Sequence, residues 1–275
     1  MSTGQGARGP GAQELSSHER DCSGTKTRGK KGAGAAMIID SHNHLGAGPG
    51  QQTAEALIAL MDRAGVDRAV AFPYVEVLDS GHNDWMAETV ARYPDRLIGY
   101  AAVNPWQPGA AREVRRAVVE KGLRGLKLHP FLHAYSIAQH DLVDPIFEAC
   151  RELGIPVVIH GAGEWSNMPL QFDEMARSFP EVTIVMAHMG TIWGFQEALM
   201  VAARRPNILL GTALAFSGFV QLAVERVGAE RVLMETDTPV QAFEAEIAKI
   251  EIAVPDRAAR ELVMGGNIAR ILSIG

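Results

Sequence analysis

The chain has 275 residues, of which 47% are hydrophobic, so one domain with a large core can form. No apolar run reaches the roughly 18 to 20 residues that a membrane helix needs, and the N-terminus lacks the apolar segment of a signal peptide. A formal net charge of -6 argues against an extended nucleic-acid surface, and Cys22 and Cys150 have no metal or disulfide spacing. We therefore expect a cytoplasmic protein with neither nucleic acid nor membrane as a partner.

The N-terminal segment is polar and basic. Residues 1–36 are rich in Gly, Ser, Thr, Lys and Arg, and Leu15 is almost the only large apolar residue there. Such a segment cannot offset its own ordering entropy, which predicts a disordered tail over 1–36 and a single catalytic domain over 37–275. Met37 begins the first predicted strand, which raises the hypothesis that translation starts there. An intact mass that includes residues before Met37, measured on protein from the native host, would refute it.

From Met37 onward, short β-branched runs alternate with longer amphipathic stretches, the pattern of repeated βα units. The eight expected strands are MIID, RAVAFPY, LIGYAAV, LRGLKLH, IPVVIH, VTIVMAH, NILLGTA and RVLMETD. Helices are predicted at about 51–65, 81–93, 109–121, 141–153, 170–178, 193–204, 217–228, 241–252 and 256–272. Glycines suited to ending helices stand at Gly65, Gly122, Gly154 and Gly228. The pattern predicts the α/β class and a (β/α)8 TIM barrel.

Polar residues collect where the predicted strands end, which is the functional face of such a barrel. They are His42, His44, Lys127, His129, His160, His188 and Asp237. Neutral imidazole and carboxylate together suit a divalent transition metal, with zinc expected first and manganese, iron, cobalt or nickel as alternatives. Histidines from the first and fifth strands plus Asp237 would leave room for a water whose pKa falls towards ~7. Asp237 could take a proton from that water, and His188 either completes the ligand set or stabilises charge nearby.

Six motifs carry a resemblance to a known family: IIDSHNHLG, GLKLHP, VVIHGA, MAHMG, ETDTP and GGNIARIL. In order and spacing they resemble the amidohydrolase superfamily, and within it the amidohydrolase-2 branch, from Met37 to the C-terminus. That branch includes aminocarboxymuconate-semialdehyde decarboxylase and γ-resorcylate decarboxylase relatives, alongside lactone and ester hydrolases. The resemblance implies one divalent metal bound by His42, His44, His160 and Asp237, with His188 as a catalytic histidine. Members of the branch are often dimers, so a homodimer stays open.

Lys127 and His129 share the inward side of the fourth predicted strand. In binuclear members of the superfamily a lysine on this strand is carboxylated and bridges two metals, whereas the amidohydrolase-2 branch commonly pairs a GLKLHP-like sequence with one metal. We therefore interpret Lys127 as a cation beside the metal ligands, and we hypothesise Glu235 as its ion partner. The bridging carbamate remains the alternative.

Aromatic residues follow several strands on loops that open to the same face. They are Trp106, Trp165 and Trp193, with Tyr74 and Phe131 near strand ends. Such walls suit a small planar or partly apolar substrate, although burial as loop anchors is the alternative. Polar loop groups are Glu76, Asn104 and Glu164, and His129 and His133 are the candidates for binding a carboxylate.

These observations favour a metal-dependent hydrolase of a small ester, lactone or amide that uses metal-activated water. The alternative is a non-oxidative decarboxylase of an aromatic or enoic carboxylic acid, because both chemistries occur on the same ligand set in the branch. ETDTP also resembles TatD-like nucleases, which carry a glutamate ligand where this chain has GLKLHP. A barrel that binds a ligand without turnover is the last alternative.

Overall fold

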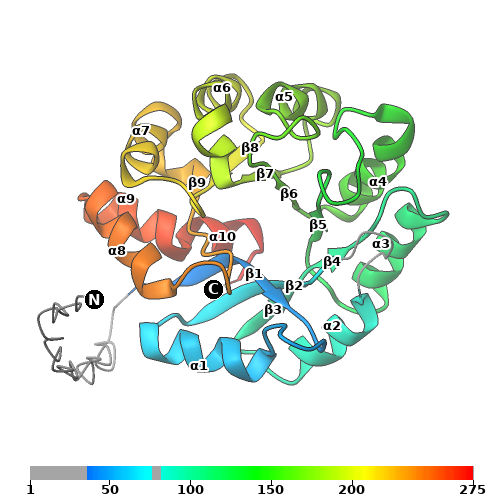
Figure 1. Ribbon diagram of the computed structural model, residues 1–275, viewed down its shortest axis with the longest axis horizontal. Helices are drawn as coiled ribbons and strands as arrows, with labels where there is room; N and C mark the ends of the chain where they lie inside the picture. Colours follow the sequence, from blue (N-terminus) through cyan, green and yellow to red (C-terminus); the bar gives the residue numbers. More distant parts are fainter. Residues whose placement is uncertain (1–35, 76–81, 275) are drawn as a thin grey trace, which may run out of the picture.

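The computed structural model describes residues 36–75 and 82–274, so residues 1–35 of the tail predicted over 1–36 and Glu76 lie outside the described residues. Parallel strands form the inside of a ring of helices (Figure 1). The strands are β1 (Ile39–Leu45), β2 (Arg68–Pro73), β3 (Leu97–Gly99), β4 (Ala101–Ala102), β5 (Leu126–Leu128), β6 (Val157–His160), β7 (Ile184–Ala187), β8 (Ile208–Gly211) and β9 (Val232–Leu233). Each pairs with the next in chain order, except that β3 and β4 belong to two separate ladders.

The third predicted strand is interrupted at Tyr100, which gives β3 and β4. Tyr100 N still donates to Ala71 O at 2.9 Å, while Ala101 N donates to Gly125 O at 2.8 Å. The chain therefore changes partner at this residue, from β2 on one side to β5 on the other. The buried Tyr100 ring packs on Gly125, where an added Cβ would lie 2.5 Å from the ring. The two ladders are thus parts of one continuous wall.

Hydrogen bonds between the first and last strand regions close the barrel. Ser41 N donates to Met234 O at 3.0 Å, and His44 N donates to Thr238 O at 3.0 Å. Asn43 and Thr238 also form a parallel bridge. The prediction of a (β/α)8 barrel is therefore confirmed.

The helices follow the predicted periodicity. They are α1 (Ala54–Ala64), α2 (Asn83–Ala91), α3 (Ala110–Val119), α4 (His140–Leu153), α5 (Pro169–Ser178), α6 (Thr191–Arg204), α7 (Ser217–Val227), α8 (Phe243–Ala253), α9 (Arg257–Glu261) and α10 (Asn267–Ile271), with short helical turns at His188–Gly190 and Ala229–Arg231. Gly65 and Gly154 end α1 and α4 in the left-handed conformation, as predicted. Gly228 ends α7 with φ 90° and ψ 147°, which is a different turn.

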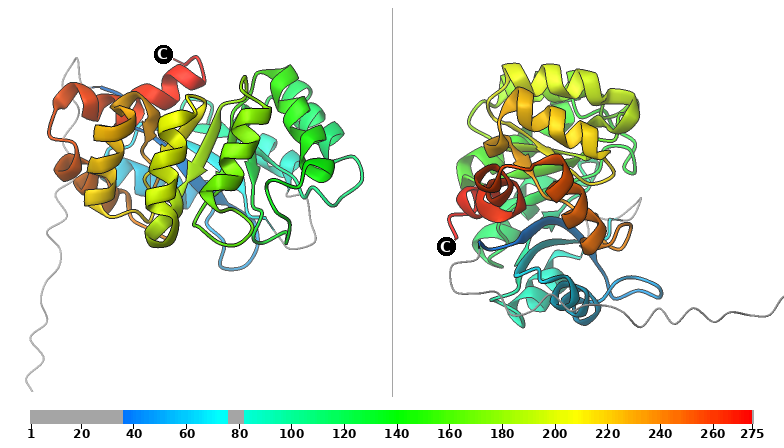
Figure 2. Two further views of the ribbon diagram at one scale, coloured as in Figure 1. Left: turned by 90° about the horizontal axis from the view of Figure 1, so that it is seen from above. Right: turned by 90° about the vertical axis from the view of Figure 1, so that its left-hand side faces the viewer.

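The last predicted helix, over 256–272, is not continuous. A π-helical stretch, Leu262–Gly266, separates α9 from α10. A Cβ at Gly265 would lie 2.2 Å from Met37 O, so the backbone of the first strand passes directly against this glycine. The close approach explains the break. Beyond it, α10 lies at one end of the barrel (Figure 2), where Ile268 and Leu272 pack on the barrel interior.

Side chains alternate between two cores along each strand. In β6, Val158 packs inside the barrel, whereas Val157 and Ile159 pack between the strands and the helices. Lys127 lies between Leu126 and Leu128, which both face the helices. The period-two alternation therefore turns Lys127 and His160 towards the barrel axis.

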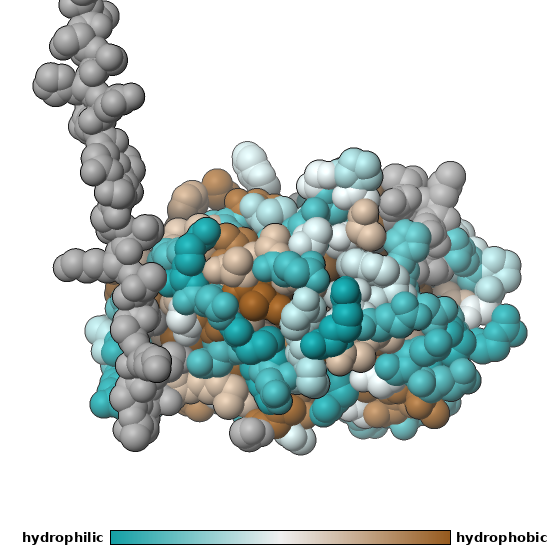
Figure 3. Space-filling view, turned by 90° about the horizontal axis from the view of Figure 1, so that it is seen from below, coloured by the Kyte–Doolittle hydropathy of each residue, from teal (hydrophilic) through white to brown (hydrophobic). Residues whose placement is uncertain are grey.

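Within the described residues, no helix is long and apolar enough to cross a bilayer. The face in Figure 3 carries both hydrophilic and hydrophobic residues.

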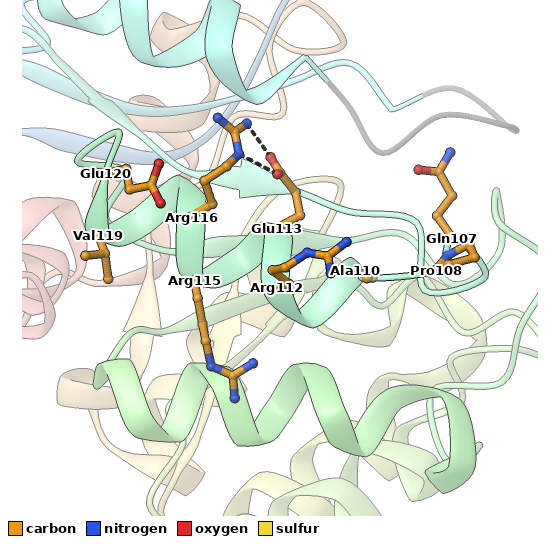
Figure 4. A pocket seen from close by; sticks show the side chains of 10 residues that line it. Gln107, Pro108, Ala110, Arg112, Glu113, Arg115, Arg116, Val119 and Glu120 are labelled. Atoms are coloured by element: carbon orange, nitrogen blue, oxygen red, sulfur yellow. Dashed lines mark hydrogen bonds and ion pairs between the residues drawn. The ribbon is translucent and has the colours of Figure 1, made fainter.

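A groove of about 630 Å³ runs along α3 (Figure 4). Arg115 pairs there with Glu152 and Arg116 with Glu113, so these arginines lie on a solvated helix face. The groove contains none of the predicted site residues.

Candidate metal centre

A bulge at the start of β1 sets the direction of its histidines. The pairing of β1 with β2 shifts register between Asp40 and Asn43. The buried Asp40 carboxylate accepts hydrogen bonds from His42 N and Asn43 Nδ2, both at 2.9 Å, and from the Thr236 hydroxyl. Asp40 therefore stabilises the distorted backbone that presents His42 and His44.

The structure brings His42, His44 and Asp237 together. Asp237 Oδ1 lies 3.2 Å from His42 Nε2 and 3.1 Å from His44 Nε2. One ligand atom from each of the three residues lies within 4.8 Å of the others. Bonds of about 2.0 to 2.2 Å from a divalent metal to N or O put neighbouring ligand atoms on the order of 3 Å apart. The separations fit three ligands of one ion.

The charges of this cluster also fit a cation. Burial alone would raise the pKa of Asp237, but hydrogen bonds from His42 and His44 outweigh it and hold the pKa well below its usual range. Burial lowers the pKa of His44 to about 4. At neutral pH the cluster therefore offers a carboxylate and a neutral imidazole, the donor set that divalent transition metals prefer.

His160 and His188 form a second group, on the ends of β6 and β7. His188 Nε2 lies 3.1 Å from His160 Nδ1, and His160 Nε2 lies 3.1 Å from Glu164 Oε1. The His129 ring stacks on His160 with 4.1 Å between centroids. The His188 ring centroid is 5.2 Å from that of His42. The predicted fourth ligand, His160, thus lies next to the catalytic candidate His188 and outside the cluster of His42, His44 and Asp237.

Lys127 is fully buried next to the cluster, but not in the pairing that the sequence suggests. Its Nζ lies 3.3 Å from His42 Nε2 and 4.8 Å from the centroid of the Phe72 ring. Among the described residues Lys127 forms no ion pair with Glu235, so that hypothesis is wrong for this structure. Burial lowers the pKa of Lys127 to about 8, with partial compensation from Asp237 and Glu235.

Some residues that organise the site were missed from the sequence. Asn43 Nδ2 donates to Val70 O at 2.9 Å, and the Thr238 hydroxyl donates to Asn43 Oδ1 at 2.7 Å. Gln52 Nε2 donates to Thr238 Oγ1 at 2.9 Å and to His44 O at 3.0 Å. The polar residues between the histidines in DSHNH and after Asp237 in ETDTP were the available signal for Asn43 and Thr238.

Trp106 and Trp165 lie on the loops that follow β4 and β6, as predicted, whereas Trp193 lies in the first turn of α6 and not on a loop. The exposed fractions are 52% for Trp106, 61% for Trp165 and 83% for Trp193. Trp106 Nε1 donates to His133 O at 2.9 Å, and its backbone N donates to Asn104 Oδ1 at 3.1 Å. Trp106 therefore joins two loops, while Trp165 and Trp193 remain open to contact a ligand.

The described loops around this mouth carry no Lys or Arg side chain. In the described residues, no Lys or Arg lies between the end of a strand and the helix that follows it. The sequence of residues 76–81, EVLDSG, also has none. Glu164 stands among these loops. The loops of the mouth are therefore aromatic and neutral to acidic, and the cation next to the cluster is Lys127 on β5.

The sequence of this chain is similar to a family profile and to two decarboxylases. It matches the profile of the amidohydrolase-2 family, described as amidohydrolase, over residues 39–274. It is 23% identical over 247 residues to γ-resorcylate decarboxylase of Polaromonas sp. (strain JS666 / ATCC BAA-500), covering 70% of this chain and 75% of that protein. A shorter match, 35% identical over 80 residues, is to 2-amino-3-carboxymuconate-6-semialdehyde decarboxylase of Dictyostelium discoideum and spans 28% of this chain and 22% of that protein.

Solved structures share the fold. 5-Carboxyvanillate decarboxylase LigW from Sphingomonas paucimobilis superposes with a TM-score of 0.71 at 20% identity, over 88% of this chain and all (100%) of that one. A dihydroxybenzoic acid decarboxylase from Polaromonas sp. JS666, solved with bound manganese, gives 0.71 at 18% identity over 87% of this chain and 97% of that one. The profile match extends over nearly the whole barrel, and the chain belongs to the amidohydrolase-2 family.

Proposed function

We propose that this protein is a metal-dependent, non-oxidative decarboxylase of an aromatic monocarboxylic acid. The observation that carries the proposal is the cluster of His42, His44 and Asp237 at a mouth lined by aromatic residues. Its relatives γ-resorcylate decarboxylase and LigW support this chemistry, and they favour it over the ester, lactone or amide hydrolase expected first from the sequence. Manganese is the proposed ion in place of zinc, because decarboxylases with this fold were solved with manganese.

The residues have separate roles. His42, His44 and Asp237 hold the ion, and we propose His160 as the further ligand. When bound, the ion would neutralise and orient the substrate carboxylate. The Trp165 and Trp193 side chains are exposed at the mouth and can stack on a planar ring.

Proton handling falls to Asp237 and His188. Asp237 is anionic at neutral pH, so it can take a proton from a substrate hydroxyl or from water and pass it to the ring carbon that bears the carboxylate. The bond between this carbon and the carboxylate then breaks, its electron pair restores the ring, and CO2 leaves. Burial holds the pKa of His188 well below its usual value, so a neutral imidazole is available to accept or donate a hydrogen bond near the ring.

The neutral to acidic loops limit the substrate to one carboxylate. A second carboxylate outside the metal site would need a cationic partner, and the described loops provide no Lys or Arg. The aromatic rings suit an apolar or hydroxylated remainder of the substrate.

Product analysis tests the proposal. The manganese-loaded protein is incubated with 2,6-dihydroxybenzoate, with 5-carboxyvanillate as a dicarboxylate, and with aryl esters and lactones. We expect CO2 and the decarboxylated phenol from the monocarboxylate, and no CO2 from Asp237→Asn. Acid release from esters or lactones with no CO2 from any acid would contradict the decarboxylase and support the hydrolase.

A further inference from the structure

Glu235 occupies the barrel interior, on the opposite edge of the His42 ring from Asp237. Its side chain is fully buried, and among the described residues neither carboxylate oxygen has a hydrogen-bond partner. Asp237 faces His42 Nε2, whereas Glu235 Oε2 faces His42 Nδ1 at 3.6 Å. A buried carboxylate without hydrogen bonds is unfavourable because its lost hydration is not replaced. Packing alone does not explain this residue.

His42 has the complementary unpaired atom. Its Nδ1 is buried and has no hydrogen-bond partner among the described residues. Its Nε2 lies near Asp237 Oδ1 and Lys127 Nζ, at 3.2 and 3.3 Å. A neutral imidazole carries its proton on one nitrogen only, so donation of Nδ1–H to Glu235 leaves the Nε2 lone pair free. The Lys127 ammonium can donate only to an unprotonated Nε2, so it favours the same tautomer, whereas the Asp237 carboxylate accepts only from Nε2–H and opposes it when no ion lies between them.

The neighbouring strand leaves space for this carboxylate. A Cβ at Gly211, the last residue of β8, would lie 1.8 Å from Glu235 Oε2 and 2.1 Å from Glu235 Cδ. The backbone N of Glu235 donates to Thr212 Oγ1 at 3.1 Å, which fixes the residue in place. The carboxylate therefore lies directly over a position where no side chain other than glycine fits.

We propose that Glu235 is a positioning residue for the metal centre. Its carboxylate accepts the Nδ1 proton of His42 and so holds Nε2 of this ring, unprotonated, towards Asp237. Gly211 provides the space that the carboxylate needs. A partner on the second nitrogen of a metal-binding histidine orients the ring and raises its basicity, and loss of such a partner weakens metal binding about 10- to 100-fold.

The first test uses the metal-free full-length protein with 15N-labelled histidine, at one neutral pH. Long-range 1H–15N spectra distinguish the two imidazole tautomers, and His42→Ala assigns the signal. We expect the Nδ1–H tautomer for His42. Observation of the Nε2–H tautomer would overturn the proposal, and this result does not depend on any Glu235 variant folding.

The second test is the dissociation constant of Mn²⁺, measured by titration of metal-free protein. Glu235→Gln keeps an acceptor and loses the charge, and Glu235→Leu loses both, so we expect the constant to rise about 10-fold and about 100-fold, respectively. The matched control is Asp173→Asn, another largely buried carboxylate, which pairs with Arg204 and Arg205 and should leave the constant unchanged. Folded Glu235→Leu protein that binds Mn²⁺ as tightly as wild type would refute the positioning role. If Glu235→Leu does not fold, wild-type affinity in Glu235→Gln together with an unchanged His42 tautomer refutes it.

Discussion

The two sides of the barrel mouth differ in how completely they are organised. Where β1 meets β9, the ligand atoms of His42, His44 and Asp237 already lie within 4.8 Å of one another. On the side of β6 and β7, His160 and His188 contact each other at 3.1 Å, and His160 reaches out to Glu164 on a half-exposed loop. The β1–β9 side has the arrangement of a metal site. The β6–β7 side has a row of contacts from His188 through His160 to Glu164 on the loop.

The backbone explains this difference. Asp237 N donates to His42 O at 2.9 Å, so ligands from both ends of the chain are fixed by one hydrogen-bond ladder. His160, in contrast, is the last residue of β6 and is followed directly by a loop. Asp237 itself lies in a turn beyond β9, and its backbone hydrogen bond to His42 holds it against β1. We infer that the β1–β9 side determines whether metal binds, while the β6–β7 side adapts to ion and substrate.

The largest expected effect is that of Asp237→Asn. It removes the carboxylate that both His42 and His44 face, and with it the proposed proton carrier. We expect metal content by elemental mass spectrometry to fall clearly below one ion per chain, and kcat to fall by about 10²- to 10⁴-fold. Full metal content together with full turnover would remove Asp237 from the mechanism. Asp173→Asn, which only breaks pairs with Arg204 and Arg205, is the control.

His188→Asn should separate chemistry from metal binding. His188 lies outside the cluster of His42, His44 and Asp237, so the ion should stay. Loss of a group that assists proton transfer should lower kcat by about 10²-fold. His140→Asn, a change in a half-exposed histidine paired with Asp144, serves as the control. Loss of the ion in His188→Asn would place this residue among the ligands and contradict the division between the two sides.

His160→Ala should weaken the binding of Mn²⁺ by about 10-fold, less than His42→Ala, if His160 joins the ligands only once the ion is present. Glu164→Gln is the matched variant, because it changes the other partner of His160 Nε2. An equal loss of Mn²⁺ affinity in His160→Ala and His42→Ala would mean that the β6–β7 side and the β1–β9 side contribute equally to metal binding.

The smallest effect concerns stability and pH. Burial raises the pKa of Glu246 from 4.5 to about 7, with Lys249 partly compensating. The native state therefore binds this proton more tightly than the unfolded state, so its contribution is full below pH 4.5 and is lost as pH rises towards 7. In the wild type, the titration of Glu246 should lower the free energy of unfolding by about 1 to 3 kcal/mol as the pH rises over this range. Glu246→Gln should lack this decrease. Urea titrations at several pH values measure it, and Glu244→Gln on the exposed face of α8 should keep the wild-type slope.

Periodicity was sufficient to predict the barrel, and strand-end chemistry was sufficient to predict that His42, His44 and Asp237 lie together at its mouth. The alternation of short apolar runs with amphipathic stretches carries that information locally. The break at Tyr100 and the π-helical stretch at Gly265 were not predictable, because each depends on a distant residue, Gly125 and Met37, respectively. Likewise, whether Lys127 meets Glu235 or His42 depends on side-chain packing across the barrel.

The seam between β1 and β9 has a consequence for biosynthesis. Asp40 and Thr236, whose side chains join across it, are 196 residues apart. The ribosome must therefore synthesise the chain through Asp237, and this segment must leave the exit tunnel, before His44 can contact Asp237. No truncated product that ends before Asp237 can assemble the cluster of His42, His44 and Asp237. An ion held by His42, His44 and Asp237, as we propose, would bind only the closed barrel and would stabilise it against opening at this seam.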